Sequence, residues 1–177
     1  AGAELDLPHC VIAGIGDVNA DGKSDVIWRN STSGTVAVWL MDGHTITSVG
    51  FPGTVSTGWA LEQIGDVDRN GTADLIWQNT NSKVVVVWLM NGATIASSKS
   101  LGGVPGEWKI VGLGDVNADR KADIIWRNSN SGAVAVWLMN GLTVMSTGVP
   151  GSATLVFEVA GVGDVDGNGT ADLIWRN

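Results

Sequence analysis

One nine-residue segment rich in carboxylate and amide side chains occurs four times in this chain of 177 residues. The first copy reads Asp-Val-Asn-Ala-Asp-Gly-Lys-Ser-Asp and begins at Asp17. The others begin at Asp66, Asp115 and Asp164, so each copy starts 49 residues after the previous one. A constant spacing of this size is typical of a repeat architecture, in which each unit packs mainly against its neighbours.

Each segment offers the ligands that a hard cation prefers. Oxygen-bearing side chains stand at positions 1, 3, 5 and 9, position 7 can add a backbone carbonyl, and the segments contain no His or Cys. This oxygen-only set favours Ca²⁺ over zinc or copper and predicts up to four calcium ions per chain. The expected ligands are Asp17, Asn19, Asp21, Lys23 and Asp25; Asp66, Asp68, Asn70, Thr72 and Asp74; Asp115, Asn117, Asp119, Lys121 and Asp123; and Asp164, Asp166, Asn168, Thr170 and Asp172.

Position 6 distinguishes the third segment from the others. Tight winding around an ion requires positive φ at this position, which glycine adopts readily. The first, second and fourth segments have glycine there, whereas the third has Arg120. Backbone strain and a nearby positive charge would both weaken ion binding. We therefore expect residues 115–123 to form the weakest site.

Two alternatives compete with this interpretation. An EF-hand begins with a similar pattern, but it needs a bidentate Glu at position 12, where this chain has Trp28, Trp77, Trp126 and Trp175. The segments could also be Asx-type turns that need no ion. Against that reading, each segment would hold three carboxylates close together without a counter-ion.

The residues between the segments predict four strands per repeat. In the second repeat these are residues 59–67, 73–79, 83–90 and 93–101, with a hairpin turn at Asn91-Gly92. The third strand of each repeat is apolar on both faces, which indicates a sheet that is covered on both sides. The expected fold is all-β, a β-propeller of four-stranded antiparallel blades, since a period near 50 suits such blades. A parallel β-helix has shorter repeats without hairpins.

The repeats divide the chain into three complete blades and a half blade. After a lead at residues 1–8, the blades are expected at about 9–57, 58–106 and 107–155, with the half blade at about 156–177. An exposed strand edge at the half blade would be a liability. Either a second copy covers it in a homo-oligomer, or the chain is a fragment of a longer one.

The charge distribution narrows the possible partners and locations. Twelve of the 18 acidic residues lie in the four segments, so four Ca²⁺ would offset the net charge of −8, and no basic face for nucleic acid remains. No run of apolar residues is long enough to span a membrane.

Loops of this charge generally need extracellular calcium levels, which favours a secreted or periplasmic protein. Asn70 and Asn168 lie in N-glycosylation patterns, and a glycan would compete with the ion, so a bacterial origin is favoured.

The segment and its apolar continuation, Gly-Asp-Val-Asn-Ala-Asp-Gly-Lys-Ser-Asp-Val-Ile-Trp from Gly16 to Trp28, resemble the FG-GAP/VCBS repeat. This repeat is found in integrin α-subunit propellers and in extracellular propellers of bacteria and fungi. The resemblance covers almost the whole chain after Pro8. It implies a β-propeller with one Ca²⁺ in the hairpin between the first two strands of each blade, and Arg120 is the departure from the pattern.

Some FG-GAP-type propellers are lectins that hold sugars between blades, which leads to the first functional hypothesis, a non-enzymatic carbohydrate-binding module. A Trp beside planar hydrogen-bonding side chains suits sugar recognition. The alternative is structural: Trp packs, Arg covers its neighbour and Asn caps a turn. The candidate residues are Trp28, Arg29, Asn30, Trp77, Gln78, Asn79, Trp126, Arg127 and Asn128.

Two further hypotheses remain. The chain could be a structural or adhesion module that binds a protein, with calcium only stabilising the blades. An enzyme is not expected, because His9 and His44 do not recur with the repeat and the carboxylates are required by the metal.

Overall fold

The computed structural model describes residues 9–177, which form four antiparallel sheets. Three sheets have four strands each in sequential order, and the fourth has two strands. This arrangement confirms the predicted all-β fold with three complete blades and a half blade. The expected lead at residues 1–8 lies outside the described residues.

The strands follow the repeat. Blade 1 contains β1 (Cys10–Gly16), β2 (Asp25–Asn30), β3 (Thr35–Asp42) and β4 (Thr45–Thr54). Blade 2 contains β5 (Trp59–Gly65), β6 (Asp74–Asn79), β7 (Val84–Asn91) and β8 (Thr94–Gly103). Blade 3 contains β9 (Trp108–Gly114), β10 (Asp123–Asn128), β11 (Ala133–Asn140) and β12 (Thr143–Ser152). The half blade contains β13 (Glu158–Gly163) and β14 (Asp172–Arg176).

Glycine turns set the registers of the outer hairpins. The predicted turn between the third and fourth strands contains Gly43, Gly92 and Gly141, with φ of 61°, 60° and 57°. These positive values are the conformation that such short hairpin turns require. In every blade the first strand also contains a bulge, so its pairing with the second strand shifts by one residue.

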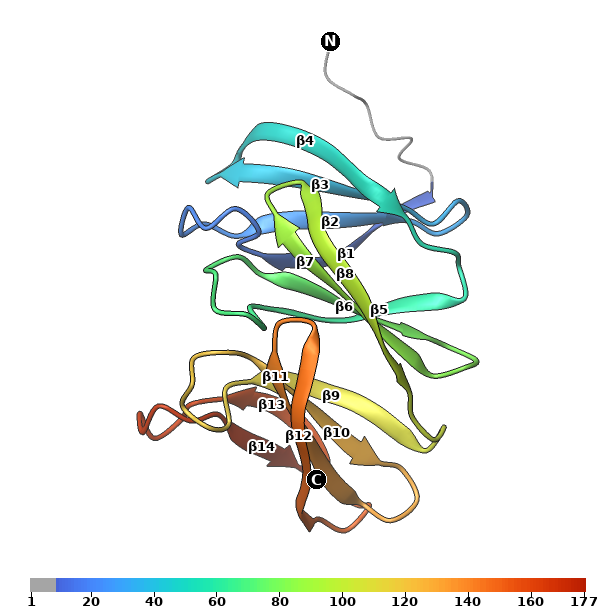
Figure 1. Ribbon diagram of the computed structural model, residues 1–177, viewed down its shortest axis with the longest axis vertical. Helices are drawn as coiled ribbons and strands as arrows, with labels where there is room; N and C mark the ends of the chain where they lie inside the picture. Colours follow the sequence, from blue (N-terminus) through green and yellow to red (C-terminus); the bar gives the residue numbers. More distant parts are fainter. Residues whose placement is uncertain (1–8) are drawn as a thin grey trace.

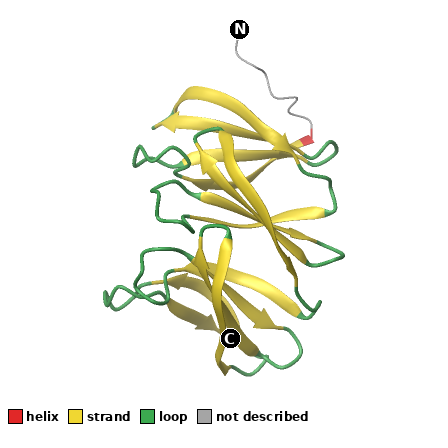
Figure 2. Ribbon diagram, in the orientation of Figure 1, coloured by secondary structure: helices red, strands yellow, loops and turns green. Residues whose placement is uncertain are grey.

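The blades stack in chain order, and neighbouring blades meet through their first strands, β1 with β5, β5 with β9, and β9 with β13 (Figure 1). The hairpin loops between the first and second strands lie along one edge of this stack, as do the green loops at the left of Figure 2. The linkers between blades lie at the opposite edge. No helix in the described part of the chain is long and apolar enough to cross a membrane.

Glycines allow the first strands to approach closely. A Cβ added to Gly16 would lie 2.8 Å from Ile64 Cγ2, and one on Gly114 would lie 2.7 Å from Val162 Cγ1. We call the glycines of the preceding blade the socket and the large apolar residue of the following blade the knob. The knobs inside the chain are Ile64, Leu113 and Val162.

Backbone hydrogen bonds repeat at the same junctions. The amides of Ala73, Ala122 and Ala171 each donate to the carbonyl of the loop aspartate one blade earlier, at 2.6, 2.8 and 2.6 Å. Apolar clusters lie between blades 1 and 2 and between blades 2 and 3. Because the clusters contain side chains from both blades, the core of the molecule lies at the junctions rather than inside any one sheet.

Candidate functional site

Each acidic segment forms the loop between the first and second strands of its blade, so the four loops share one edge of the stack. The side chain of the aspartate at position 1 accepts hydrogen bonds from several backbone amides of its own loop. In the second loop, Asp66 Oδ1 accepts hydrogen bonds from the amides of Arg69 and Asn70 at 2.6 and 3.2 Å, and Oδ2 accepts one from Gly71 at 2.9 Å. In the other three loops the amides of positions 5 and 6 donate in the same way to Asp17, Asp115 and Asp164.

The aspartate at position 9 connects the loop to the third strand of the blade. Asp74 is fully buried, and its two carboxylate oxygens accept hydrogen bonds from the amides of Val67 (3.1 Å) and Met90 (2.9 Å). Asp25 and Asp123 are equally buried and bonded in the same way. The sequence predicted these residues as ligands, but it did not reveal this second role.

Burial raises the pKa of Asp74 to about 7, although the amides of Met90 and Val67 favour its charged form, and the negative charges of Asp68 and Asp66 raise it further. Burial likewise raises the pKa of Asp123. A carboxylate that is difficult to ionise in the protein alone is one that a bound cation would stabilise in its charged form.

The second and fourth loops bring three carboxylates together. Ligand oxygens of Asp66, Asp68 and Asp74 lie within 4.8 Å of one another, as do those of Asp164, Asp166 and Asp172. In the described residues, these are the two groups of at least three acidic, His or Cys side chains with this geometry. The first and third loops have Asn at position 3, and its amide donates to the Asp at position 5, at 3.2 Å in Asn19 and 3.4 Å in Asn117.

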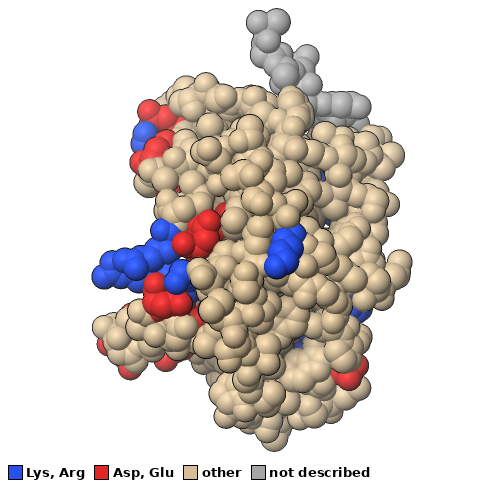
Figure 3. All heavy atoms as spheres, in the orientation of Figure 1, with Lys and Arg blue, Asp and Glu red and all other residues tan. Residues whose placement is uncertain are grey.

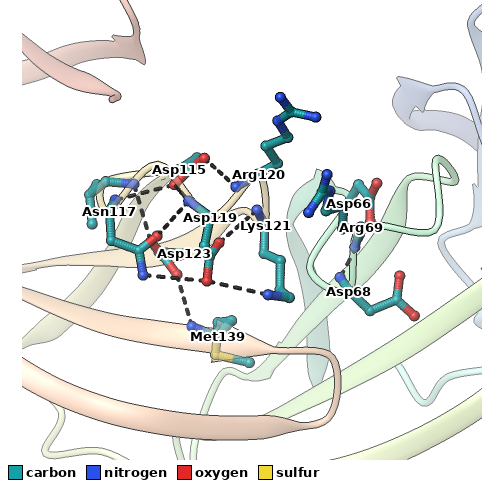
Figure 4. A network of polar contacts seen from close by, with 11 residues as sticks. Asp66, Asp68, Arg69, Asp115, Asn117, Asp119, Arg120, Lys121, Asp123 and Met139 are labelled. Atoms are coloured by element: carbon teal, nitrogen blue, oxygen red, sulfur yellow. Dashed lines mark hydrogen bonds and ion pairs between the residues drawn. The ribbon is translucent and has the colours of Figure 1, made fainter. Parts of the chain in front are cut away.

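The third loop contains its own cation. Lys121 Nζ lies 3.4 Å from Asp119 Oδ2. Although burial opposes it, the hydrogen bonds from the Lys121 amide and ammonium, together with the charge of that ammonium, hold the pKa of Asp119 below its usual value. In the first loop, Lys23 instead pairs with Asp42 outside the loop at 3.0 Å. The side chain of Arg120 points out of the loop (Figure 4), so the cation close to the carboxylates is Lys121.

Position 6 has the left-handed backbone that the sequence predicted. Gly22, Gly71 and Gly169 have φ of 81°, 88° and 88°, and Arg120 has 67°. Position 4 is also left-handed, with φ of 60° at Ala20, 64° at Arg69 and 61° at Ala118. Sequence reasoning missed position 4, although Gly167 in the fourth loop was a signal for it.

At the opposite edge, the Asn of each Trp-Arg/Gln-Asn triplet caps a turn. Asn30 Oδ1 accepts hydrogen bonds from the amides of Thr32 (2.9 Å) and Ser33 (2.8 Å), and Asn79 and Asn128 do the same. The Trp of the triplet packs against a Trp on the next strand, with ring centroids 4.8 to 5.3 Å apart, in the pairs Trp28–Trp39, Trp77–Trp88 and Trp126–Trp137. This geometry agrees with the structural alternative for Asn and Trp.

The arginines of the triplets hold the linkers to the following blade. Arg127 Nη2 donates to the carbonyls of Ala153, Thr154 and Phe157 at 3.2, 3.1 and 3.0 Å, and its guanidinium carbon lies 4.7 Å from the ring centroid of Trp175. Arg29 forms the same clamp on the carbonyls of Val55, Ser56 and Trp59 and on the ring of Trp77.

Blade 2 lacks this clamp because Gln78 takes the place of the arginine. Gln78 is almost fully buried, and its Nε2 has no hydrogen-bond partner. A pocket of about 490 Å³ lies between the linker that follows and blade 3, lined by Val104, Pro105, Trp108, Trp126, Ala135, Trp137 and Thr147 among others.

Smaller pockets occupy the equivalent places at the neighbouring junctions. One of about 220 Å³ lies beside Trp59, Trp77 and Trp88, and one of about 270 Å³ lies beside Leu173 and Trp175. Of the predicted ligand-binding residues, Trp77 and Trp126 therefore line pockets between blades. The arginine side chains are bonded to linkers, and Arg127 also lines a separate pocket of about 370 Å³ beside Lys109, Phe157 and Glu158. Trp108 and Trp137 were not among the predicted residues, although both recur with the repeat.

Comparisons with known proteins agree with this architecture. The sequence model of the FG-GAP-like repeat matches residues 17–77, 66–126 and 115–175. Among solved structures, the Tc holotoxin pore of Photorhabdus luminescens superposes with a TM-score of 0.63 at 16% sequence identity. The match covers 98% of this chain and 8% of the toxin chain, so the likeness concerns the fold alone. No curated protein matches the chain.

Proposed function

This chain belongs to the FG-GAP-like repeat family, and from that premise we propose that it is a calcium-stabilised, non-enzymatic binding module that recognises carbohydrate between blades 2 and 3. The observation that carries the proposal is the pocket lined by Trp108, Trp126 and Trp137. A setting outside the cell or in the periplasm would supply the calcium that loops of this kind need.

The calcium part of the proposal is supported by the donor sets of the loops. The second and fourth loops converge three carboxylates each, and oxygen ligands are those that Ca²⁺ prefers. Asp66, Asp68 and Asp74 would hold one ion, and Asp164, Asp166 and Asp172 another, with Asn70 and Asn168 at position 5 as further oxygen donors. The first and third loops would bind more weakly, since their three carboxylates do not all converge within 4.8 Å as those of the second and fourth loops do, and Lys121 neutralises a carboxylate of the third.

Calorimetric titration with Ca²⁺ tests this part. We expect binding that saturates at two strong sites, with weaker sites behind them. Asp68→Asn should remove one strong site, whereas the matched loss of a carboxylate in Glu107→Gln, outside the loops, should leave the titration unchanged. Absence of heat and of any stabilisation by Ca²⁺ would refute the calcium part.

The carbohydrate part is supported by the shape and chemistry of the pocket. Its volume of about 490 Å³ lies within the range of roughly 300–1,000 Å³ that is usual for small-molecule sites. Indole faces bind the C–H groups of sugars, while Thr147 and the polar backbone atoms of Gly103 and Gly148 can bond to hydroxyl groups. The similar but smaller pockets at the other junctions would provide weaker copies of the same site.

A glycan array followed by quenching of tryptophan fluorescence identifies the sugar. Gly148 lines the large pocket, has nothing within 4 Å of an added Cβ and does not need positive φ, so Gly148→Phe should fill the pocket without unfolding the blade. Gly151 is equally open and lines the pocket of about 270 Å³, so Gly151→Phe is the matched control. We expect Gly148→Phe to abolish quenching and Gly151→Phe to keep most of it.

A protein ligand is the second candidate. It is favoured by Met145 and Val149, which are largely exposed on β12, and Val149 also lines the large pocket. A response to no sugar on a diverse array, combined with binding of a protein partner that Gly148→Phe blocks, would support this alternative. Hydrolysis of any polysaccharide by the purified chain would contradict the non-enzymatic assignment.

A further inference from the structure

The junction between blades 1 and 2 contains a binding site for a cation, and the cation is an arginine of the chain itself. The guanidinium of Arg29 donates to three carbonyls of the linker, those of Val55 (3.3 Å), Ser56 (2.8 Å) and Trp59. Its carbon lies 5.4 Å from the ring centroid of Trp77. Arg127 binds the carbonyls of the same three repeat positions, and the ring of Trp175, at the junction of blade 3 with the half blade. Three carbonyls and one indole ring therefore hold one cation at each of these junctions.

At the junction of blades 2 and 3 the acceptors are present, but the chain supplies no cation. The carbonyls at the same repeat positions belong to Val104, Pro105 and Trp108, and the ring belongs to Trp126. Gln78 stands at the position of the arginine. No side chain of the described residues donates a hydrogen bond to these three carbonyls. This junction thus has the acceptors of a cation site without an internal guanidinium.

The acceptors belong to residues in the wall of the large pocket. All four residues line it, namely Val104, Pro105, Trp108 and Trp126. The pocket measures about 490 Å³, whereas the pocket beside the equivalent residues of the arginine-bearing junction measures about 220 Å³. The smaller Ala135 in place of Val86 adds to the difference. Its lining residues in the described chain include no Lys, Arg, Asp or Glu, so backbone carbonyls and indole rings determine which charge it favours.

The amide of Gln78 adds a requirement of its own. Gln78 is 4% exposed, and its Nε2 has no hydrogen-bond partner in the described residues. A buried donor without an acceptor is costly, and a ligand that brings an oxygen to it recovers that cost. The junction therefore suits a ligand that carries a cation and, beside it, a neutral oxygen acceptor. An ammonium group next to a hydroxyl group has this chemistry.

We propose that the pocket between blades 2 and 3 takes a sugar with a protonated amine, of the 2-amino-2-deoxyhexose class. This inference rests on the proposed carbohydrate site and names the class of sugar that the site takes. The ammonium donates to the linker carbonyls and lies over the ring of Trp126, as the guanidinium of Arg29 does over Trp77. The neighbouring hydroxyl oxygen accepts from Gln78 Nε2, and the C–H groups of the sugar pack on Trp108 and Trp137. A carboxylated sugar is disfavoured, because its charge would face carbonyl oxygens.

Three oligosaccharides with the same linkage test the proposal: β-1,4-linked tetramers of glucosamine, N-acetylglucosamine and glucose. Quenching of tryptophan fluorescence measures their affinities. We expect the glucosamine tetramer to bind at least about tenfold more tightly than either neutral tetramer, because only it supplies the cation. Calcium is kept constant and salt at about 0.15 M, which screens general attraction of a polycation to the acidic chain.

Variants at position 78 locate the preference. Gln78→Arg places a guanidinium on the same carbonyls, so the glucosamine tetramer should lose its advantage over the neutral tetramers. Gln78→Met removes the amide without adding charge, so all three tetramers should weaken to a similar extent and the preference should persist. Ala96→Arg is the matched charge control, since Ala96 is exposed on β8 and does not line the pocket. It adds the same charge as Gln78→Arg and should keep the preference.

The possible failures can be told apart. Binding of none of the three tetramers would overturn this inference together with the proposed carbohydrate site. Neutral tetramers that bind as tightly as the glucosamine tetramer would overturn the inference and leave the carbohydrate site standing. A preference that Gln78→Arg retains, or that Ala96→Arg abolishes, would also overturn it, because the amine would then be attracted by another part of the acidic chain. Circular dichroism verifies that each variant is folded.

Discussion

Oxygen atoms with negative or partial negative charge converge at both edges of the blade stack, but the two edges differ in what supplies the positive charge. At the linker edge, backbone carbonyls from the segment between blades converge, and the guanidinium of Arg29 or Arg127 supplies the positive charge. At the loop edge, carboxylates converge, and in the second loop no Lys or Arg of the described residues pairs with them. In the surface view, acidic and basic side chains gather along the loop edge (Figure 3).

This difference predicts which edge has a stability that depends on the ions in solution. The linker edge carries its cation as a side chain, so its stability should be independent of dissolved ions. Under the proposed calcium binding, the loop edge takes its cation from solution, so its stability should follow the calcium concentration. The linker edge of blade 2 has no such cation, because the uncharged Gln78 takes the place of the arginine. Four predictions probe this comparison.

Removal of calcium should have the largest effect. Two strong sites, each saturated at about 100 times its dissociation constant, would contribute about 5 kcal/mol, which corresponds to roughly 10–20 °C in Tm for a chain of this size. Differential scanning calorimetry with Ca²⁺ and with chelator measures the change. A Tm that chelator does not alter would remove the distinction between the two edges.

Arg127→Ala should have the next largest effect. It leaves several linker carbonyls without a donor and uncovers the ring of Trp175, so we expect a loss of about 3 kcal/mol. Arg29→Ala should cost less, because Arg29 is less buried. Thermal unfolding in both conditions provides the test, because the loss should be equal with calcium and with chelator. A loss seen only in chelator would mean that the edges are coupled.

Gln78→Arg should convert the linker edge of blade 2 to the clamped form. An arginine there can reach the carbonyls of Val104 and Pro105 as Arg29 reaches those of Val55 and Ser56, and we expect a gain of about 1 kcal/mol. Gln78→Met is the control, because it removes the unpaired amide without adding a donor. Chemical denaturation distinguishes them: equal gains would assign the effect to the lost amide rather than to a clamp.

Arg120→Gly should have the smallest effect on stability, within about 0.5 kcal/mol, because relief of backbone strain is offset by the greater freedom of glycine in the unfolded chain. Its informative readout is calcium affinity at the third loop, which should rise by about two- to threefold as a positive charge is removed. Lys121→Thr, which restores the residue of the second and fourth loops, should raise it further. Calorimetric titration measures both, and a weaker third site in either variant would contradict this account.

Most of the fold could be predicted from the sequence because its determinants are local and occur several times. The hairpin glycines, the alternation of turns and apolar runs, and the 49-residue period determine four strands per blade. The first strand of blade 2 ends at Gly65 rather than at residue 67, because Asp66 already takes part in the loop. The bulge in each first strand was not predicted, because no residue of the strand signals it in the sequence.

The candidate site was predictable in its residues and less so in their roles. The loop oxygens and the left-handed position 6 follow from spacing and from glycine. The bond from Asp74 to the amide of Met90 joins residues 16 positions apart across two strands, so no sequence motif reveals it. The arginines were visible as a repeated residue type, but their carbonyl partners belong to the following linker, about 26 to 30 residues away.

The knob and socket have an evolutionary consequence. Every junction is built from the same pair of surfaces at the same offset, so an unequal crossover that inserts or deletes one whole 49-residue unit recreates an intact junction at the join. Lineages can therefore lengthen or shorten such a chain in single genetic events without first evolving a new interface. The residue at the position of Gln78, which lies beside each linker, travels with the unit and is one of the residues that distinguish one repeat from another.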